Sequence, residues 1–417
     1  MGGGTRPAAR TDPPGRQLLR SGRHVPVGGT ARGLAGPGDL PARPCGPSRT
    51  GRPGPPDRHP DRRRTGPTVT DTSSTRGEID MLSALFRKNR ATTTEAPEGL
   101  PVLDAEDTTD TTDAAAWAAG RRGELRELVA ERGAVTVRGL GLRTPADVAS
   151  VLRQVAGRPL AEHEAFAARD RHADGVYSSS AWPPSQPMCM HHELSYALEC
   201  PGLMLFACLE PPVEGGATAL ADATAVLRAL PADLVARFAR EGWLLTRAYN
   251  EGIGATLAQS FGTDDRGEVE AYCRAHAIDW SWQPDGSLRT WQHRHAVVRH
   301  PVSGRPCWFN QIAFLNEWTM ASEVREFLIE EYGPDGLPFN TRYGNGDPVP
   351  PDVVEQINKT YETHTVRRAW QRGDLMLVDN IRTAHSREAY QGQRNVVVAM
   401  ADPVRPGLPG PLGSEAA

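Results

Sequence analysis

The 417-residue sequence lacks the features that would place it in several common classes of protein. It has no run of 18 apolar residues and no signal-peptide core, so we expect no membrane span and a cytoplasmic location. No G-x-G-x-x-G or G-x-x-x-x-G-K-[ST] motif follows an expected strand, which argues against a nucleotide-binding βαβ fold. None of the six cysteines forms a CxxC pair, and free, mostly buried thiols are the plain interpretation.

The first 68 residues contain no lysine and few large apolar side chains. They hold 14 Gly, 13 Pro, 13 Arg and 4 Asp, which gives a net charge of +9. Such a segment cannot form a core, and we expect disorder. Because the whole chain carries −4, the remainder carries −13. That acidic balance argues against nucleic acid as the main partner.

Three interpretations of this basic head compete. In the first, the head is a disordered tail, or the start codon is assigned too early and translation begins near Val69 or Met81. In the second it is a transit peptide, and in the third it is an arm that binds nucleic acid. We favour the first, because Pro and Gly would break an amphipathic helix and no aromatic residue lies between the arginines. We therefore expect a head over residues 1–80, one domain over 81–402 and a tail over 403–417.

Short strand patterns alternate with helical ones along the rest of the chain. Apolar spacing predicts helices at 114–132, 144–156, 222–230, 232–241, 321–331 and 351–363. Alternation or apolar runs predict strands at 134–140, 203–209, 218–221, 243–249, 289–299, 306–314, 365–371, 375–379 and 395–401. Many short strands with peripheral helices predict a mainly β fold, a sandwich or barrel with helical additions.

The segment Met190–Tyr196 (MHHELSY) carries the first candidate metal ligands. On extended backbone, residues i and i+2 point to the same side, so His191 and Glu193 would face together while His192 points away. A second cluster covers residues 373–400, where an apolar strand ends at Asp379-Asn380 before His385 and Arg394. Two histidines and one carboxylate can form the facial triad of non-haem Fe(II) oxygenases.

The stretches HHELSY, GGATALAD, WFNQ and GDLMLVDNIRTAHSREAYQGQR resemble the TauD/TfdA family of Fe(II)/2-oxoglutarate-dependent dioxygenases. The similarity covers roughly residues 100–402 and is strongest to the branch of clavaminate synthase and amino-acid hydroxylases. It implies a double-stranded β-helix, or jelly roll, flanked by helices. It makes His191, Glu193 and His385 the iron ligands. It pairs Arg394 and Thr218 with the distal carboxylate of 2-oxoglutarate.

The resemblance also implies the chemistry. Fe(II) with 2-oxoglutarate and O2 as co-substrates would hydroxylate a C–H bond of an amino acid or its derivative, free or on a carrier protein, in natural-product biosynthesis. Desaturation or ring closure by the same centre, a non-catalytic sensor and a zinc hydrolase are the alternatives. Neutral histidines and an ionised carboxylate are needed as ligands, so iron binding should weaken at acidic pH. The oligomeric state is left open.

Two details refine this interpretation. Related halogenases lose the carboxylate ligand to make room for chloride, so the presence of Glu193 disfavours halogenation. Several family members carry a second arginine four residues after the one that binds 2-oxoglutarate, to hold a substrate anion. Val398 stands at that position here. The substrate's acid is then held elsewhere, or is masked as a carrier thioester.

Other residues carry weaker signals. Asn310 and Arg387 are tentative substrate contacts, and for each a structural role, in strand packing or in holding a loop, is an equal alternative. The group His293, His295 and His300 resembles a metal cluster but has no carboxylate beside it in the sequence, which favours solvated or structural roles. Residues 177–180 are expected to form a lid over the site.

Overall fold

The computed structural model describes residues 99–105, 111–161, 163–164, 166, 169–180, 182–250 and 253–407. The predicted head lies outside this part of the chain. The predicted tail lies outside it from residue 408 onward. The last strand of the structure extends to Val404, past the expected boundary at residue 403.

A seven-stranded sheet forms the centre of the fold. Its strands in spatial order are β1 (Val102–Asp104), β2 (Ala134–Arg138), β16 (Leu375–Asp379), β6 (Cys200–Glu210), β19 (Asn395–Val404), β4 (Val176–Ser178) and β3 (Arg171–Ala173). The pairing of β1 with β2 is parallel, and the other pairings are antiparallel.

Strand β6 explains why this sheet is covered on both faces. Its apolar run sends Met204 and Phe206 into one buried cluster, while Leu203 and Leu205 enter a second cluster on the opposite face. Successive side chains of a strand alternate between faces, so a continuous apolar run requires two packed layers.

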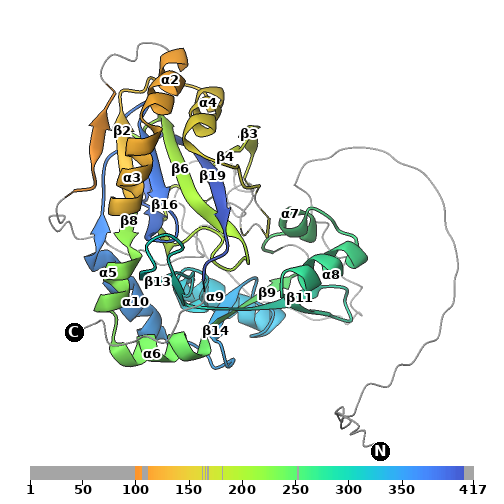
Figure 1. Cartoon of the computed structure of the whole chain (residues 1–417). Coiled ribbons are helices and arrows are strands. Elements are labelled where there is room, and N and C mark those ends of the chain that lie inside the picture. Colours follow the sequence, from red (N-terminus) through yellow and green to blue (C-terminus); the bar gives the residue numbers. More distant parts are fainter. Residues whose placement is uncertain are drawn as a thin grey trace, which may run out of the picture. The chain divides into compact units, whose positions relative to one another are not determined.

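Three helices cover one face of the central sheet, as Figure 1 shows. They are α2 (Thr111–Gly120), α3 (Arg122–Arg132) and α4 (Pro145–Val155). Helix α4 begins with a capping box between Thr144 and Asp147. The single helix expected over 114–132 is instead two helices that meet around Gly120, a residue that weakens helix interiors.

A four-stranded sheet packs against the other face. Its order is β15 (Thr365–Val366), β8 (Thr218–Asp222), β17 (Thr383–Arg387) and β5 (Met188–His191). Contact between the sheets is direct, because the Phe206 ring on β6 lies 5.1 Å from the His385 ring on β17. The expected combination of strands with flanking helices is therefore found.

A second four-stranded sheet consists of β10 (Asp279–Trp282), β11 (Leu288–Arg294), β9 (Trp243–Tyr249) and β14 (Asn340–Tyr343). Helices α7 (Leu257–Phe261) and α8 (Arg266–Ala275) pack with it around a small cluster of their own, and Figure 1 shows them beside β9 and β11. The elements α7, α8, β10 and β14 were not predicted from the sequence.

The remaining elements include helices and strands that were predicted and three short elements, at 214–215, 317–319 and 390–391, that were not. They are β7 (Glu214–Gly215), α5 (Ala223–Ala229), α6 (Ala232–Glu241), β12 (Val297–Arg299), β13 (Pro306–Trp308), η1 (Glu317–Thr319), α9 (Ser322–Tyr332), α10 (Pro351–Thr363) and β18 (Tyr390–Gln391). Three expected strands differ in extent: 306–314 ends at Trp308, 365–371 ends at Val366, and 289–299 is divided into β11 and β12. After Trp308 the Asn310 side chain accepts the Ile312 N–H, which bends the backbone away from a sheet ladder.

Within the described ranges, no helix combines the length and apolar character needed to cross a membrane. The five cysteines described are all free, and four of them are buried. The burial of these thiols agrees with the expectation of free, mostly buried cysteines.

Candidate metal centre

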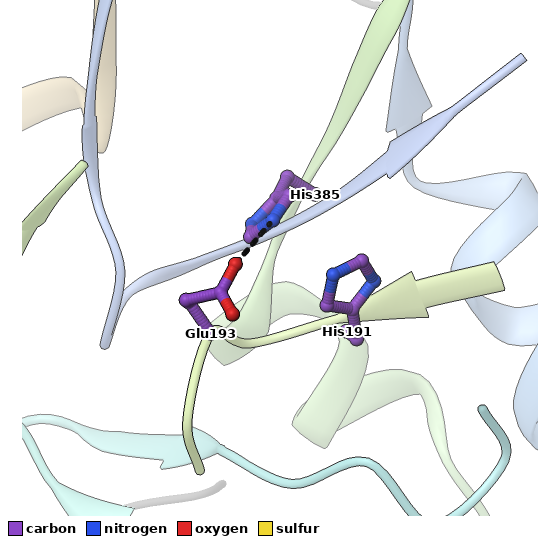
Figure 2. Close-up of side chains that lie close together, drawn as sticks. All are labelled: His191, Glu193 and His385. Atoms are coloured by element: carbon purple, nitrogen blue, oxygen red, sulfur yellow. Dashed lines mark ion pairs between the residues drawn. The ribbon is translucent and has the colours of Figure 1, made fainter. Parts of the chain in front are cut away.

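Two neighbouring strands and one turn bring the three predicted ligands together. His385 on β17 lies directly opposite His191 at the end of β5, and Glu193 follows two residues later. Donor atoms from the three side chains all lie within 4.8 Å of one another, and each residue is buried. Figure 2 shows the three side chains pointing toward a common space. Glu193 lies in a turn rather than on the extended backbone that the sequence argument assumed.

The ring of His191 is held in an orientation that suits a metal ligand. Its Nδ1 lies 2.9 Å from the carbonyl oxygen of Cys189, and the ring stacks on Phe314 at 4.6 Å. A carbonyl oxygen only accepts, so Nδ1 carries the proton and Nε2 keeps its lone pair. His192 faces elsewhere, with Nδ1 2.6 Å from the carbonyl oxygen of Asn380. The predicted division of the His191-His192 pair matches this geometry.

Two side chains that the sequence analysis did not assign hold Glu193. Arg169 Nη2 lies 2.8 Å from Glu193 Oε2, and both side chains are buried. Asn380 fixes the backbone, because its Oδ1 accepts the Glu193 N–H at 2.8 Å and its Nδ2 donates to the Glu193 carbonyl at 2.9 Å. The same Nδ2 donates to the carbonyl of Pro201. Arg169 thus balances the charge of the Glu193 carboxylate, and Asn380 fixes the Glu193 backbone.

The electrostatics favour the protonation states that a metal requires. Burial lowers the pKa of His385 well below its ordinary value, with further lowering from His191, His192 and Arg169. Burial also lowers the pKa of His191. For Glu193 burial raises the pKa, but Arg169 and His191 outweigh it and the net shift is downward. Both rings are therefore neutral and the carboxylate ionised near neutral pH.

A cavity between the two facing sheets contains the triad and the predicted 2-oxoglutarate residues. Arg394 Nε donates to the carbonyl of Gly216 at 2.9 Å, and its Nη2 lies 3.5 Å from Thr218 Oγ1. Its Nη1 lies 3.4 Å from Ser179 Oγ. Burial lowers the pKa of Arg394 to about 10, which leaves the guanidinium charged at neutral pH. A charged guanidinium with hydroxyls beside it suits a carboxylate.

The two tentative substrate residues are held by protein groups. Asn310 Nδ2 donates to the carbonyl of Ala296 at 3.1 Å, and the residue does not line the cavity. This favours its structural alternative. Arg387 does line the cavity, but it donates to the carbonyls of Trp182, Pro183 and Gln186. The alternative in which Arg387 holds a loop is therefore the one the contacts support.

The second histidine group has structural contacts. His300 Nε2 lies 2.7 Å from Asp379 Oδ2, so a carboxylate is in fact adjacent, although no neighbouring residue in the sequence indicated it. His293 Nε2 lies 2.7 Å from the carbonyl of Glu241. Of the predicted lid, Ser179 and Ser180 line the cavity. Whether the segment moves over the site stays a prediction.

Taken together, the donor set fits a divalent iron ion. Two neutral imidazoles and one carboxylate converge without hydrogen bonding to one another, since His385 Nε2 and Glu193 Oε2 are 3.8 Å apart. Such a set on one side of a metal leaves positions for other ligands. The class that this site defines is the mononuclear non-haem iron oxygenase.

Comparison with known proteins gives the family. The profile of the "Taurine catabolism dioxygenase TauD, TfdA family" matches residues 93–400, and the chain belongs to this family. It is an Fe(II)- and 2-oxoglutarate-dependent oxygenase that uses O2. It is 33% identical over 280 residues to the dapdiamide synthesis protein DdaC of Enterobacter agglomerans, covering 67% of this chain and 85% of that protein.

Two further similarities are weaker. A clavaminate synthase-like protein of Arabidopsis thaliana is 26% identical over 287 residues, covering 66% of this chain and 83% of that protein. A putative alpha-ketoglutarate-dependent taurine dioxygenase from Burkholderia xenovorans shares 16% identity with a TM-score of 0.44, covering 76% of this chain and 91% of that one. The family assignment depends on the sequence matches.

Proposed function

We propose that this protein hydroxylates an unactivated C–H bond of an amino acid or an amino-acid-derived substrate in natural-product biosynthesis. The observation that carries the proposal is the presence of a complete His191, Glu193 and His385 set in the same cavity as Arg394. Retention of Glu193 favours hydroxylation over halogenation. The name of the relative DdaC, which refers to dapdiamide synthesis, supports the biosynthetic setting.

The residues take distinct roles in this proposal. His191, Glu193 and His385 hold Fe(II), while Arg394 and Thr218 hold the distal carboxylate of 2-oxoglutarate. Bound iron supplies the oxidising chemistry, in which 2-oxoglutarate, O2 and R–H give succinate, CO2 and R–OH. Asn380 fixes the position of Glu193 through its two hydrogen bonds to the Glu193 backbone. The two facing sheets would form the double-stranded β-helix of the family, with the site between them.

The first experiment tests the cofactor arrangement and the reaction together. Anaerobic addition of Fe(II) and 2-oxoglutarate should give a weak visible charge-transfer band, and admission of O2 with substrate should release succinate. Product that gains one oxygen atom supports hydroxylation. Product that loses two hydrogens instead supports desaturation or ring closure. Activity that persists under nitrogen without 2-oxoglutarate would contradict the proposal.

A second experiment addresses the form of the substrate. A screen of succinate release across amino acids, offered free and loaded on a carrier protein, should identify the preferred form. Turnover that rises on loading would make a carrier protein the partner. Rapid turnover of a free amino acid with no gain from loading would exclude the masked acid. Uncoupled succinate release without substrate, measured in parallel, supplies the baseline.

A further inference from the structure

Three arginines line the cavity, and each of them has protein partners. Arg394 lies beside Thr218 at the proposed 2-oxoglutarate end. Arg387 is bound to three backbone carbonyls of one loop. The third, Arg169, reaches the centre itself, where its guanidinium forms an ion pair with Glu193. In the reaction described so far Arg169 acts only through Glu193 and has no assigned contact with the substrate.

The backbone that carries Arg169 is anchored to the edge of the central sheet. The next residue, Asp170, donates its N–H to Ser178 Oγ at 2.9 Å and accepts the Ser178 N–H at 2.8 Å. Ser178 ends β4, and in the same strand Tyr177 pairs with Val398 of β19. Arg169 therefore enters the cavity from the strands next to Val398. Its Nε donates to Ser180 Oγ at 3.1 Å, which orients the guanidinium.

The net positive charge of the cavity lining favours an anionic substrate group. Among the described residues that line it, three arginines face one carboxylate, Glu193, for an excess of two positive charges. A divalent cation and dianionic 2-oxoglutarate cancel each other and leave that excess unchanged. Unneutralised charge in a buried site is costly, so an anionic substrate group would be strongly preferred over a neutral one.

We infer that Arg169 binds a carboxylate of the primary substrate and so takes the role of the arginine that is missing at Val398. This inference rests on the proposed function and deepens it, because it makes the substrate an acid rather than a masked thioester. Once Glu193 is neutralised by a bound cation, the guanidinium can share its donors with a second carboxylate. Arg169 is then the residue that sets substrate specificity.

The test measures substrate binding separately from turnover. Anaerobic enzyme with Fe(II) and 2-oxoglutarate is titrated with L-amino acids and their α-amides, and for the dicarboxylic ones also with their side-chain amides. The shift of the charge-transfer band reports binding. Wild type should bind each acid more tightly than its amide. If the α-amide loses affinity, the α-carboxylate is the group that is held, and if the side-chain amide loses affinity, the side-chain carboxylate is held.

The variant Arg169→Gln should weaken binding of the acid by at least about 30-fold relative to binding of the matching amide, as expected when one partner of a buried charge pair is removed. Arg169→Lys should retain part of the preference. Arg171→Gln is the matched control, because that side chain is exposed and forms its ion pair with Asp174 rather than with a cavity residue. It should behave as wild type.

Several outcomes overturn the inference. Equal binding of acids and amides, a response confined to thioesters, or unchanged acid affinity in Arg169→Gln would each do so. Weaker Fe(II) binding in Arg169→Gln with no change in acid preference would show instead that Arg169 only positions Glu193. Absence of the band with Fe(II) and 2-oxoglutarate in wild type would overturn the proposed function, and this inference with it.

Discussion

Two places in the molecule put histidine rings beside carboxylates, and they are built in opposite ways. In the metal centre His191, Glu193 and His385 approach one another without hydrogen bonds between them. At the second place His300 Nε2 donates to Asp379, and His300 Nδ1 accepts the N–H groups of Val302 and Ser303. There every ring nitrogen has a protein partner.

The difference shows what separates a ligand set from a structural pair. Asp379 Oδ1 accepts the N–H groups of Ile381 and Arg382, so this carboxylate is bonded at both oxygens. Such a network is complete and fixes the turn between β16 and β17. The triad, in contrast, offers lone pairs to a common point. Burial of His and carboxylate together is therefore no evidence of a metal site unless the donors converge on a space of their own.

The largest expected effect comes from removing a member of the convergent set. His191→Ala, Glu193→Ala and His385→Ala should each lower Fe(II) affinity by more than about 100-fold, beyond the 10–100-fold typical of groups that only support a ligand. Iron-dependent succinate release should be lost with it. Anaerobic Fe(II) titration followed by the visible band measures the effect.

The neighbouring His192→Ala provides the comparison within the same motif. His192 is bonded to the Asn380 carbonyl and points away from the triad, so Fe(II) binding and succinate release should be largely retained. Loss of iron binding in this variant that equals the loss in His191→Ala would contradict the assignment of the ligands.

Acid should destabilise the metal-free protein through the buried rings. Burial lowers the pKa of His192 to about 4, whereas the unfolded chain has the ordinary value of 6.5. The unfolded state then binds more protons between these values, so stability is complete above pH 6.5 and falls as the pH drops toward 4. The loss from His192 alone is about 3 kcal/mol. Urea unfolding at several pH values measures it, and His192→Gln should flatten the profile.

Asn380 lies between the two regions and should affect only one of them. It follows Asp379 in the chain, but its side chain bonds to the Glu193 backbone rather than to His300. Asn380→Ala should weaken Fe(II) binding by about 10–100-fold, because Glu193 loses its anchor. Asp379→Asn is the matched neighbour and should affect stability more than iron affinity. The reverse pattern would mean that the turn acts as a whole.

Much of the fold was predictable because it depends on local pattern. The apolar run in β6 and the periodic helix α10 carry their signal in consecutive residues. Helix α7 was missed since five residues are too few for a helical period, although Thr256 and Gln259 form a capping box. The break at Gly120 and the early end of β13 at Trp308 depend on single residues within otherwise regular patterns.

The site divides in the same way. His191 and Glu193 are two residues apart and share a motif with a chemical meaning, and His385 follows a recognisable strand. Arg169 was not predicted, because it precedes Glu193 by 24 residues in a stretch with no strand or helix pattern. Its contact depends on tertiary placement at the sheet edge. The partnership of His300 and Asp379, 79 residues apart, was hidden for the same reason.

The smallest expected effect is at the structural pair. His300→Gln leaves an amide donor within reach of Asp379 but removes the acceptor of the Val302 and Ser303 N–H groups, and should cost about 1 kcal/mol of unfolding free energy. Thermal or urea unfolding measures it, and His293→Gln, at an exposed ring with one backbone contact, should cost less. Fe(II) affinity should not change in either variant. If His300→Gln weakens iron binding as strongly as Asn380→Ala, then the structural pair is coupled to the metal centre through the β16–β17 turn, and the two regions are not independent.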